Sequence, residues 1–463
     1  MARVVVVGGG LAGLATAWFL LETAPPDFRL DVRVLERAAI PGGSVGTESS
    51  PYGPLEDGPI ALDAAAEDAS RLLRALELDG RTHDGVPGSS LALRAHGRSY
   101  AWPTSALAML RRGPLSWRGR ARLLLEPFVR GSEAIDESVT EFATRRLGRE
   151  VAELVVGPLV ESTWGGDPRK LSARHALAGL FAMERQHGRI ALAWLAKHGR
   201  GKRAMRSRRF ATLSGGLHTL TQALAHRLGD RVQCNTAVRA VWSDETGYGL
   251  ELDGGGVPVL RADVLVLAVA AKDAARMLDT SKPDLASMLR TIPYQPLAAV
   301  WSVWKRDRVA TPPSAASTLL RGDPSRRACT LDAPAIAFPS AYASEFVALR
   351  FVFARQPTLD PKIASDETLI DAALTESAAV CGTTGAPEFT RVVRMPDRAQ
   401  ATLGHHGRLL AIDSMLRHEP NLFVTGSSYR GIGVDDAIRN GRKTAEHVVH
   451  QMLLGGDGRP VVI

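Results

Sequence analysis

The strongest constraint on the fold is a glycine turn near the start of the 463-residue chain. Val4–Val7 form a run of β-branched residues, which predicts a fully buried parallel strand. The motif Gly8-x-Gly10-x-x-Gly13 follows directly and leads into a stretch with helical character. Glycines at this spacing allow a tight turn, a close backbone approach to a pyrophosphate, and close packing of the helix on the strand. The sequence therefore predicts a dinucleotide-binding turn.

The residues after this turn distinguish between dinucleotides. A second apolar stretch ends in Glu36, which lies 23 residues beyond Gly13 and has the spacing of a carboxylate that holds a ribose hydroxyl. A further glycine pair, Gly42-Gly43, follows, and then Gly58. A nicotinamide enzyme has no need of a second backbone approach at this point, whereas an extended flavin dinucleotide does. We expect FAD, held as a resident cofactor.

Composition and charge limit the class of protein. The chain is 45% hydrophobic and 23% charged, as in ordinary globular proteins of more than one domain. The net charge of +8 favours acidic partners or an anionic surface, although arginine enrichment from a GC-rich genome is an equal alternative. Cys234, Cys329 and Cys381 are scattered, so neither a disulfide framework nor a metal site is expected. With the motif starting at residue 4 and no apolar run near ~20 residues, we expect a cytoplasmic protein.

Changes in sequence pattern divide the chain into five segments. The cofactor domain is predicted to consist of three segments, residues 1–85, 210–290 and, at its C-terminal end, 396–463. Residues 86–209 read as a helical and substrate region, and residues 291–395 as a mixed sheet. The expected class is α/β.

Four stretches together resemble the protoporphyrinogen and coproporphyrinogen oxidase family of the flavin amine oxidase superfamily. They are the N-terminal turn, residues 159–176 (LVESTWGGDPRKLSARHA), residues 210–220 (FATLSGGLHTL) and residues 422–445 (LFVTGSSYRGIGVDDAIRNGRKTA). The resemblance implies a Rossmann-like FAD domain of the GR2 type built from discontinuous segments. It also implies a mixed-sheet substrate domain and a helical membrane-facing domain.

The resemblance also assigns the cofactor-binding residues. They lie in the turn, around the ribose acid, in the second glycine loop and in the C-terminal block: Gly8, Gly9, Gly10, Leu11, Ala12, Gly13, Glu36, Arg37, Gly42, Gly43, Ser44, Gly58, Pro59, Val238, Gly426, Gly433, Val434 and Asp435. Ser44 departs from the family, which has Lys, Arg or Trp there. Pro396-Asp397-Arg398 stands where the family has Pro-Gln-Tyr.

The implied reaction is oxidation of protoporphyrinogen IX to protoporphyrin IX in haem biosynthesis. A hydride leaves the methylene bridge for flavin N5 and a proton leaves a pyrrole nitrogen, in three cycles that each release hydrogen peroxide from dioxygen. The flavin carries the chemistry, so no catalytic side chain and no metal are expected. His405 is interpreted as a residue that helps to place the flavin, and a nucleophilic role for Ser427 or Ser428 is disfavoured because no triad pattern surrounds them.

Candidate substrate residues come from charge and aromatic character. Leu107 falls where many relatives place an arginine for a substrate propionate, so Arg98 or Arg111 is predicted to replace it. Phe338 and Phe351 are predicted to wall the macrocycle, with a place in the sheet core as the alternative.

Other functions and partners stay open at this point. The alternatives are coproporphyrinogen III oxidation, an amine oxidase or desaturase of the same fold, and a non-catalytic FAD-binding protein. Seven of the thirteen residues from Lys197 to Arg209 are basic, and residues 109–131 mix basic and apolar residues around Trp117. This pattern predicts attachment to an anionic membrane surface, such as the inner face of the plasma membrane, with a solvated basic loop as the alternative. No nucleic-acid partner is expected, and a homodimer is left open.

Overall fold

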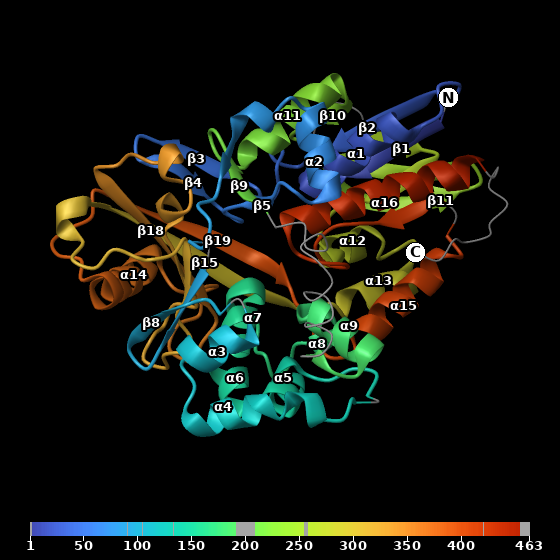
Figure 1. The fold of residues 1–463 in the computed structure, drawn as a ribbon. Helices are drawn as coiled ribbons and strands as arrows, with labels where there is room; N and C mark the ends of the chain where they lie inside the picture. Colours follow the sequence, from blue (N-terminus) through green and yellow to red (C-terminus); the bar gives the residue numbers. More distant parts are fainter. Residues whose placement is uncertain are drawn as a thin grey trace.

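The computed structural model describes residues 2–89, 91–103, 105–132, 134–190, 209–253, 258–419 and 421–453. A parallel sheet with its helices lies at the upper right of Figure 1, a larger mixed sheet lies at the left, and a group of helices lies below both. This arrangement confirms the predicted α/β class. Within the described residues, no helix combines the length and apolar character that crossing a membrane requires.

Five parallel strands form the sheet that carries the glycine turn, in the order β10-β2-β1-β14-β20. In that order the strands are Val232–Gln233, Leu30–Leu35, Ala2–Val7, Val264–Leu267 and Leu422–Val424. The valines of β1 are buried because helices or strands cover both faces of the sheet. Both ends of the chain and its middle therefore contribute to one sheet.

Two layers cover the parallel sheet. One face carries α1 (Leu11–Thr23), α2 (Glu67–Ala75), α11 (His218–Leu228) and α16 (Val434–Leu453). α1 and α16 cross closely: a Cβ at Gly441 would lie 2.9 Å from the Cβ of Ala15. The other face carries α12 (Ala271–Met277), α13 (Pro283–Arg290), α15 (His405–Leu416) and the antiparallel strands β11 (Ala237–Asp244), β12 (Gly247–Asp253) and β13 (Val259–Ala262).

The mixed sheet has seven strands in the order β19-β15-β18-β17-β16-β7-β8. In that order they are Phe389–Ala399, Tyr294–Lys305, Phe346–Ala354, Thr330–Asp332, Ser317–Leu319, Leu91–Ala95 and Arg98–Ala101. α14 (Asp366–Cys381) packs on one face. The other face meets the hairpin of β3 (Thr47–Ser50) and β4 (Gly53–Glu56), since Leu55 lies in the same cluster as Trp301. A small sheet of β5 (Leu62–Asp63), β9 (Phe210–Leu213) and β6 (Thr82–Asp84) joins these parts.

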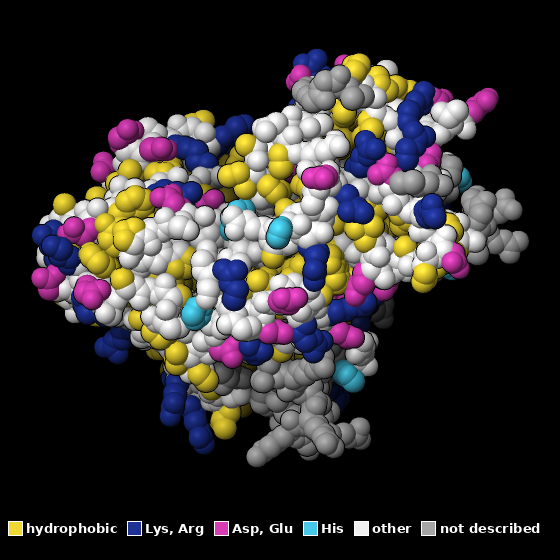
Figure 2. All heavy atoms as spheres, turned by 90° about the horizontal axis from the view of Figure 1, so that it is seen from above, with side chains coloured by type: hydrophobic (Ala, Val, Ile, Leu, Met, Phe, Trp, Pro, Cys, Tyr) yellow, Lys and Arg dark blue, Asp and Glu magenta, His cyan; other side chains and the backbone are white. Residues whose placement is uncertain are grey.

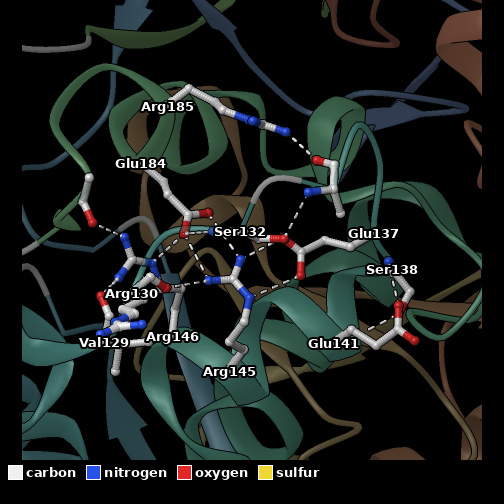
Figure 3. Close-up of polar contacts among 12 residues, drawn as sticks. Val129, Arg130, Ser132, Glu137, Ser138, Glu141, Arg145, Arg146, Glu184 and Arg185 are labelled. Atoms are coloured by element: carbon white, nitrogen blue, oxygen red, sulfur yellow. Dashed lines mark hydrogen bonds and ion pairs between the residues drawn. The ribbon is translucent and has the colours of Figure 1, made fainter.

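The helical part runs from α3 (Ala106–Arg112) to α9 (Ala178–His187). Between them lie α4 (Trp117–Leu124), α5 (Val139–Leu147), α6 (Arg149–Val151), a π-helical turn (Ala152–Val156), α7 (Gly157–Trp164) and α8 (Ala173–Ala176). An arginine pair fixes α9 against α5 (Figure 3). Arg146 is fully buried, and its Nε lies 2.8 Å from the Glu184 carboxylate, which Arg145 also contacts at 2.8 Å. The carboxylate of Glu137 adds a second partner for Arg145, so the charges of this buried network are compensated.

The charged side chains on the face seen from above are mixed in sign. Figure 2 shows Lys and Arg interspersed with Asp and Glu, with small apolar patches between them. On this face, the net positive charge is therefore not gathered into one basic patch.

Candidate cofactor and substrate site

The glycine turn after β1 has the geometry of a phosphate cradle. Gly8 has φ +110°, a conformation that favours glycine. A Cβ at Gly13 would overlap the carbonyl oxygen of Gly8, so only glycine fits there. Gly10 precedes α1 without any side-chain cap, which leaves the first amides of that helix available to an anion. Leu11 and Ala12, the first residues of the helix, are buried beneath this turn.

Glu36 lies beside the turn, at the end of β2. Its Oε2 accepts a hydrogen bond from the Gly9 amide at 2.7 Å, and its Oε1 accepts one from the Ala38 amide at 2.8 Å. The half-buried carboxylate is thus held at the edge where the strands end, and Arg37 next to it is exposed. This is the edge at which open parallel sheets bind their ligands.

The second glycine loop folds back onto the first. Gly42 donates to the carbonyl of Gly9 at 2.8 Å and forms a single parallel bridge with Gly10. Gly43 has φ +61°, and a Cβ there would lie 3.0 Å from the Cα of Gly10. Ser44 is exposed, and its carbonyl oxygen occupies the place that a side chain at Gly58 would need. The two glycine loops therefore pack against each other through their backbones.

The loop that carries Gly58 and Pro59 is held by the mixed sheet. Arg350 of β18 donates to the carbonyl of Glu56 at 3.0 Å and to that of Gly58 at 2.6 Å. Arg391 of β19 pairs with Asp57 at 2.6 Å. Two arginines of the mixed sheet thus hold the loop of residues 56–58 in place beside the second glycine loop.

Burial raises the pKa of Glu56 to about 7. Its carboxylate accepts from the Thr47 hydroxyl at 2.6 Å and from the Leu217 amide at 2.8 Å. Both oxygens are engaged within the protein, and Glu56 is also fully buried whereas Glu36 is only half-buried, so Glu56 is a structural carboxyl group.

The C-terminal block (residues 422–445) begins with β20, and its glycine loop leaves β20 at the same edge of the parallel sheet. Gly426 has φ +115°, and a Cβ there would meet no atom within 4 Å, so this backbone faces open space. α16 begins at Val434, just after the exposed Gly433. The Asp435 carboxylate accepts from the amide of Asp63 at 3.3 Å, which joins α16 to β5. The N-terminus of α16 favours negative charge, and the backbone at Gly426 is open. Together these features suit the end of a flavin ring at which negative charge develops on reduction.

Val238 is the remaining predicted cofactor residue. It is buried in β11, and the nearby Thr236 amide donates to the carbonyl of Glu36 at 2.8 Å. Val238 therefore lies in the layer that supports the end of β2.

A small cavity of about 20 Å³ lies behind the C-terminal block. Trp164, His175, Ala399, Ala401, His405, Ser427, Ser428, Tyr429 and Gly431 line it. His405 donates from Nε2 to the carbonyl of Tyr429 at 3.1 Å, and the ring of His175 lies edge-on at 4.8 Å from that of His405. Burial, together with His405, lowers the pKa of His175 to about 4, and the pKa of His405 is also lowered by burial. His405 thus supports the backbone of the C-terminal block, and its role in placing the flavin stays a prediction.

The predicted substrate residues lie in two kinds of environment. Arg98 in β8 and Arg111 in α3 are exposed. Phe351 is fully buried between the mixed sheet and α14, and Phe338 is buried beside Ala337 and Ala61. The structure thus places both phenylalanines in apolar cores, and their contact with a macrocycle stays a prediction.

The sequence interpretation did not assign roles to Arg350, Arg398 or His175. Arg398 is distinguished in the sequence only by its departure from the family pattern, and His175 lies in the 159–176 stretch without a predicted role. Their partners lie far away in sequence, so no local pattern could identify them.

The glycine cradle, the uncapped helix and the open backbone at Gly426 fit a flavin dinucleotide. Comparison with known proteins agrees. A family model described as flavin containing amine oxidoreductase matches residues 11–449. Coproporphyrinogen III oxidase of Bacillus subtilis (strain 168) is 26% identical over 458 residues, covering 95% of this chain and 96% of that protein. Protoporphyrinogen oxidase of Bos taurus is 29% identical over 484 residues, covering 96% and 98%.

Solved structures show the same fold. One from Exiguobacterium sp. 255-15 has a TM-score of 0.81 at 22% identity and covers 97% of this chain and 99% of that chain. UDP-galactopyranose mutase has a TM-score of 0.73 at 15% identity, covering 97% and 94%. The predicted family resemblance and the predicted FAD cofactor are confirmed. The chain belongs to the flavin-containing amine oxidoreductase family and is a FAD-dependent oxidoreductase.

Proposed function

We propose that this protein oxidises protoporphyrinogen IX to protoporphyrin IX with dioxygen as the acceptor. The observation that carries the proposal is similarity from end to end: relatives named as porphyrinogen oxidases cover 95% or more of the chain at 26–29% identity. Coproporphyrinogen III is the alternative substrate, because relatives of both names have similar identities.

The C-terminal block argues against an amine oxidase. Amine oxidases of this fold often hold the amine between two aromatic rings, and Tyr429 is the one aromatic residue in the segment TGSSYRG, residues 425–431. In the structure Tyr429 is buried in the apolar core with Leu409 and Ile412. Its ring is therefore engaged in packing and does not present a face to an amine.

The protein's contribution to the reaction is to bind and orient. When bound, FAD supplies a two-electron acceptor that dioxygen can reoxidise. The glycine cradle and the start of α1 would hold the pyrophosphate, and Glu36 would hold the ribose through the acceptor sites that the Gly9 and Ala38 amides leave free. Arg350 and Arg391 fix the loop around Gly58, and His405 fixes the backbone of Tyr429. Removal of six hydrogens from the substrate then requires three rounds and three molecules of dioxygen.

The test is oxidation of both porphyrinogens by the purified holoprotein, followed by porphyrin fluorescence and by peroxide release. We expect the higher kcat/KM on protoporphyrinogen IX and about three peroxides per porphyrin. Faster oxidation of coproporphyrinogen III would reassign the substrate, and activity on primary amines alone would move the protein to the amine oxidases. Arg98→Ala or Arg111→Ala should raise KM about tenfold if that arginine binds a propionate.

We also propose that the helical part attaches to an anionic membrane surface, which would place the protein on the inner face of the plasma membrane. The residues 197–208 on which part of this prediction rests lie outside the described residues. In the described part, Trp117 is 74% exposed and Phe128 is 81% exposed. Arg118 and Arg120 near Trp117, and Arg130 near Phe128, are also exposed. Exposed aromatic residues with basic neighbours suit the headgroup region of a bilayer, and a poorly soluble tetrapyrrole gives a reason for such a location.

A further inference from the structure

One face of the mixed sheet is turned towards the cofactor loop. Trp301 donates from Nε1 to the carbonyl of Glu56 at 3.1 Å, and Arg350 donates to the carbonyl of Gly58. Arg391 on the same face pairs with Asp57. Side chains on this face are therefore positioned beside the loop that carries Gly58, a predicted cofactor residue.

A β-bulge adds Arg398 to this face. In the β15–β19 pairing, Trp301, Leu297 and Gln295 lie opposite Arg391, Met395 and Arg398 respectively. β15 advances by two residues from Leu297 to Gln295, while β19 advances by three, so one extra residue lies in β19. Since side chains alternate between faces, this extra residue brings Arg398 to the face that a regular strand would have given to Asp397.

Arg398 differs from the other arginines on this face in its charge balance. Arg350 is paired with Asp332, and Arg391 is paired with Asp57 and Glu48. Arg398 donates from Nη2 to the carbonyl of Thr163 at 2.7 Å, but its buried Nε has no partner, and no carboxylate of the described residues neutralises it. Burial and the nearby Arg350 lower the pKa of Arg398 to about 10. A cation in such surroundings favours an anionic partner.

Arg398 lies close to the cavity behind the C-terminal block without lining it. Ala399, which follows Arg398 in β19, and Trp164, which follows its partner Thr163 in α7, both line that cavity, while the Arg398 side chain points to the other face of β19 from Ala399. Arg398 therefore lies where the mixed sheet, α7 and the C-terminal block meet.

We propose that Arg398 binds a carboxylate of the substrate and so orients the macrocycle against the cofactor. The inference rests on the proposed function and names a residue for the substrate's acidic side chain. A guanidinium can meet a carboxylate through two parallel hydrogen bonds, and the free Nε supplies one of these donors. Arg98 and Arg111 remain candidates for a second carboxylate nearer the surface.

The test measures binding of the oxidised product, protoporphyrin IX, and of its uncharged dimethyl ester to the FAD-loaded protein by porphyrin fluorescence. Arg398→Met should weaken binding of the free acid by about tenfold or more and leave ester binding and FAD content unchanged. Arg398→Lys should weaken acid binding less, because one charge remains without the paired donors. Arg394→Met is the matched control: Arg394 lies on the same strand, opposite Ala298 on the α14 face, and this variant should bind both ligands as wild type does.

Each outcome of these binding measurements supports or overturns the role of Arg398. Unchanged acid binding by Arg398→Met, or an equal loss for acid and ester, would overturn the role of Arg398 and leave the proposed function in place. Wild-type protein that binds neither porphyrin would overturn the proposed function, and this inference with it. If Arg398→Met does not fold, the acid-to-ester ratio of Arg398→Lys decides: a selective loss for the acid supports the inference, and an unchanged ratio overturns it.

Discussion

Replacing Asp332 with Ala would leave the buried guanidinium of Arg350 without its carboxylate partner. Nε and Nη2 of Arg350 lie 3.0 and 2.7 Å from Oδ2 of Asp332, and the two side chains are 7% and 6% exposed. Removing one partner of such a buried pair costs about 3–5 kcal/mol, because the remaining charge is not compensated. We therefore expect the free energy of unfolding of Asp332→Ala to fall by about that amount.

The same change should weaken the binding of FAD. Asp332 orients Arg350, which donates to the carbonyls of Glu56 and Gly58 in the loop predicted to contact the flavin. A loop that has lost this support must be ordered when the cofactor binds, so part of the binding free energy is used for ordering. FAD titration of the apoprotein, monitored by flavin fluorescence, measures this loss.

Denaturant unfolding of the holoprotein supplies the stability data and the controls. Asp253→Ala breaks an exposed pair with Arg239 and should change the stability little. The double variant Asp332→Ala/Arg350→Met should lose less than the sum of its two single variants, because no charge stays buried. A loss below about 1 kcal/mol for Asp332→Ala, or strict additivity in the double variant, would refute the reasoning.

Gly13→Asp should empty the cofactor site, because any side chain there meets the carbonyl oxygen of Gly8; a yellow, FAD-loaded variant would contradict this. Stability should fall as the pH decreases from 6.5 towards about 4, since burial holds the pKa of folded His175 at about 4 and the unfolded chain binds a proton first. His175→Gln should flatten this dependence in denaturant unfolding, and an unchanged slope would count against it. Trp117→Ser with Phe128→Ser should reduce co-sedimentation with anionic vesicles at low salt, and full retention would point to a different surface.

The cofactor turn could be predicted from sequence because its physical causes are local. Gly8 and Gly13 are required by backbone geometry within one turn, and Glu36 follows at a spacing set by one helix and one strand. The family resemblance extended this to the C-terminal block around Gly426. These are the features in which one short segment determines its own conformation.

The substrate side depends on contacts between distant segments. Which face Arg398 occupies is set by one extra residue in the β15–β19 register, and the pattern of hydrophobic residues in β19 does not reveal that bulge. The ring of His175 contacts the ring of His405, which lies 230 positions later in the sequence. Phe351 lies in a strand whose two faces are both buried, so alternation could not show which face meets a ligand.

Anaerobic titration of the flavin shows whether this FAD protein oxidises a porphyrinogen. Protoporphyrinogen IX added to the oxidised holoprotein without dioxygen should bleach the flavin absorbance in a single two-electron step per FAD. Fluorescent porphyrin should accumulate only after air is readmitted, because three oxidations of the substrate require the flavin to be reoxidised between them. Readmission of air should restore the yellow colour and release peroxide. A flavin that porphyrinogens leave oxidised, or that only an amine reduces, would contradict the account.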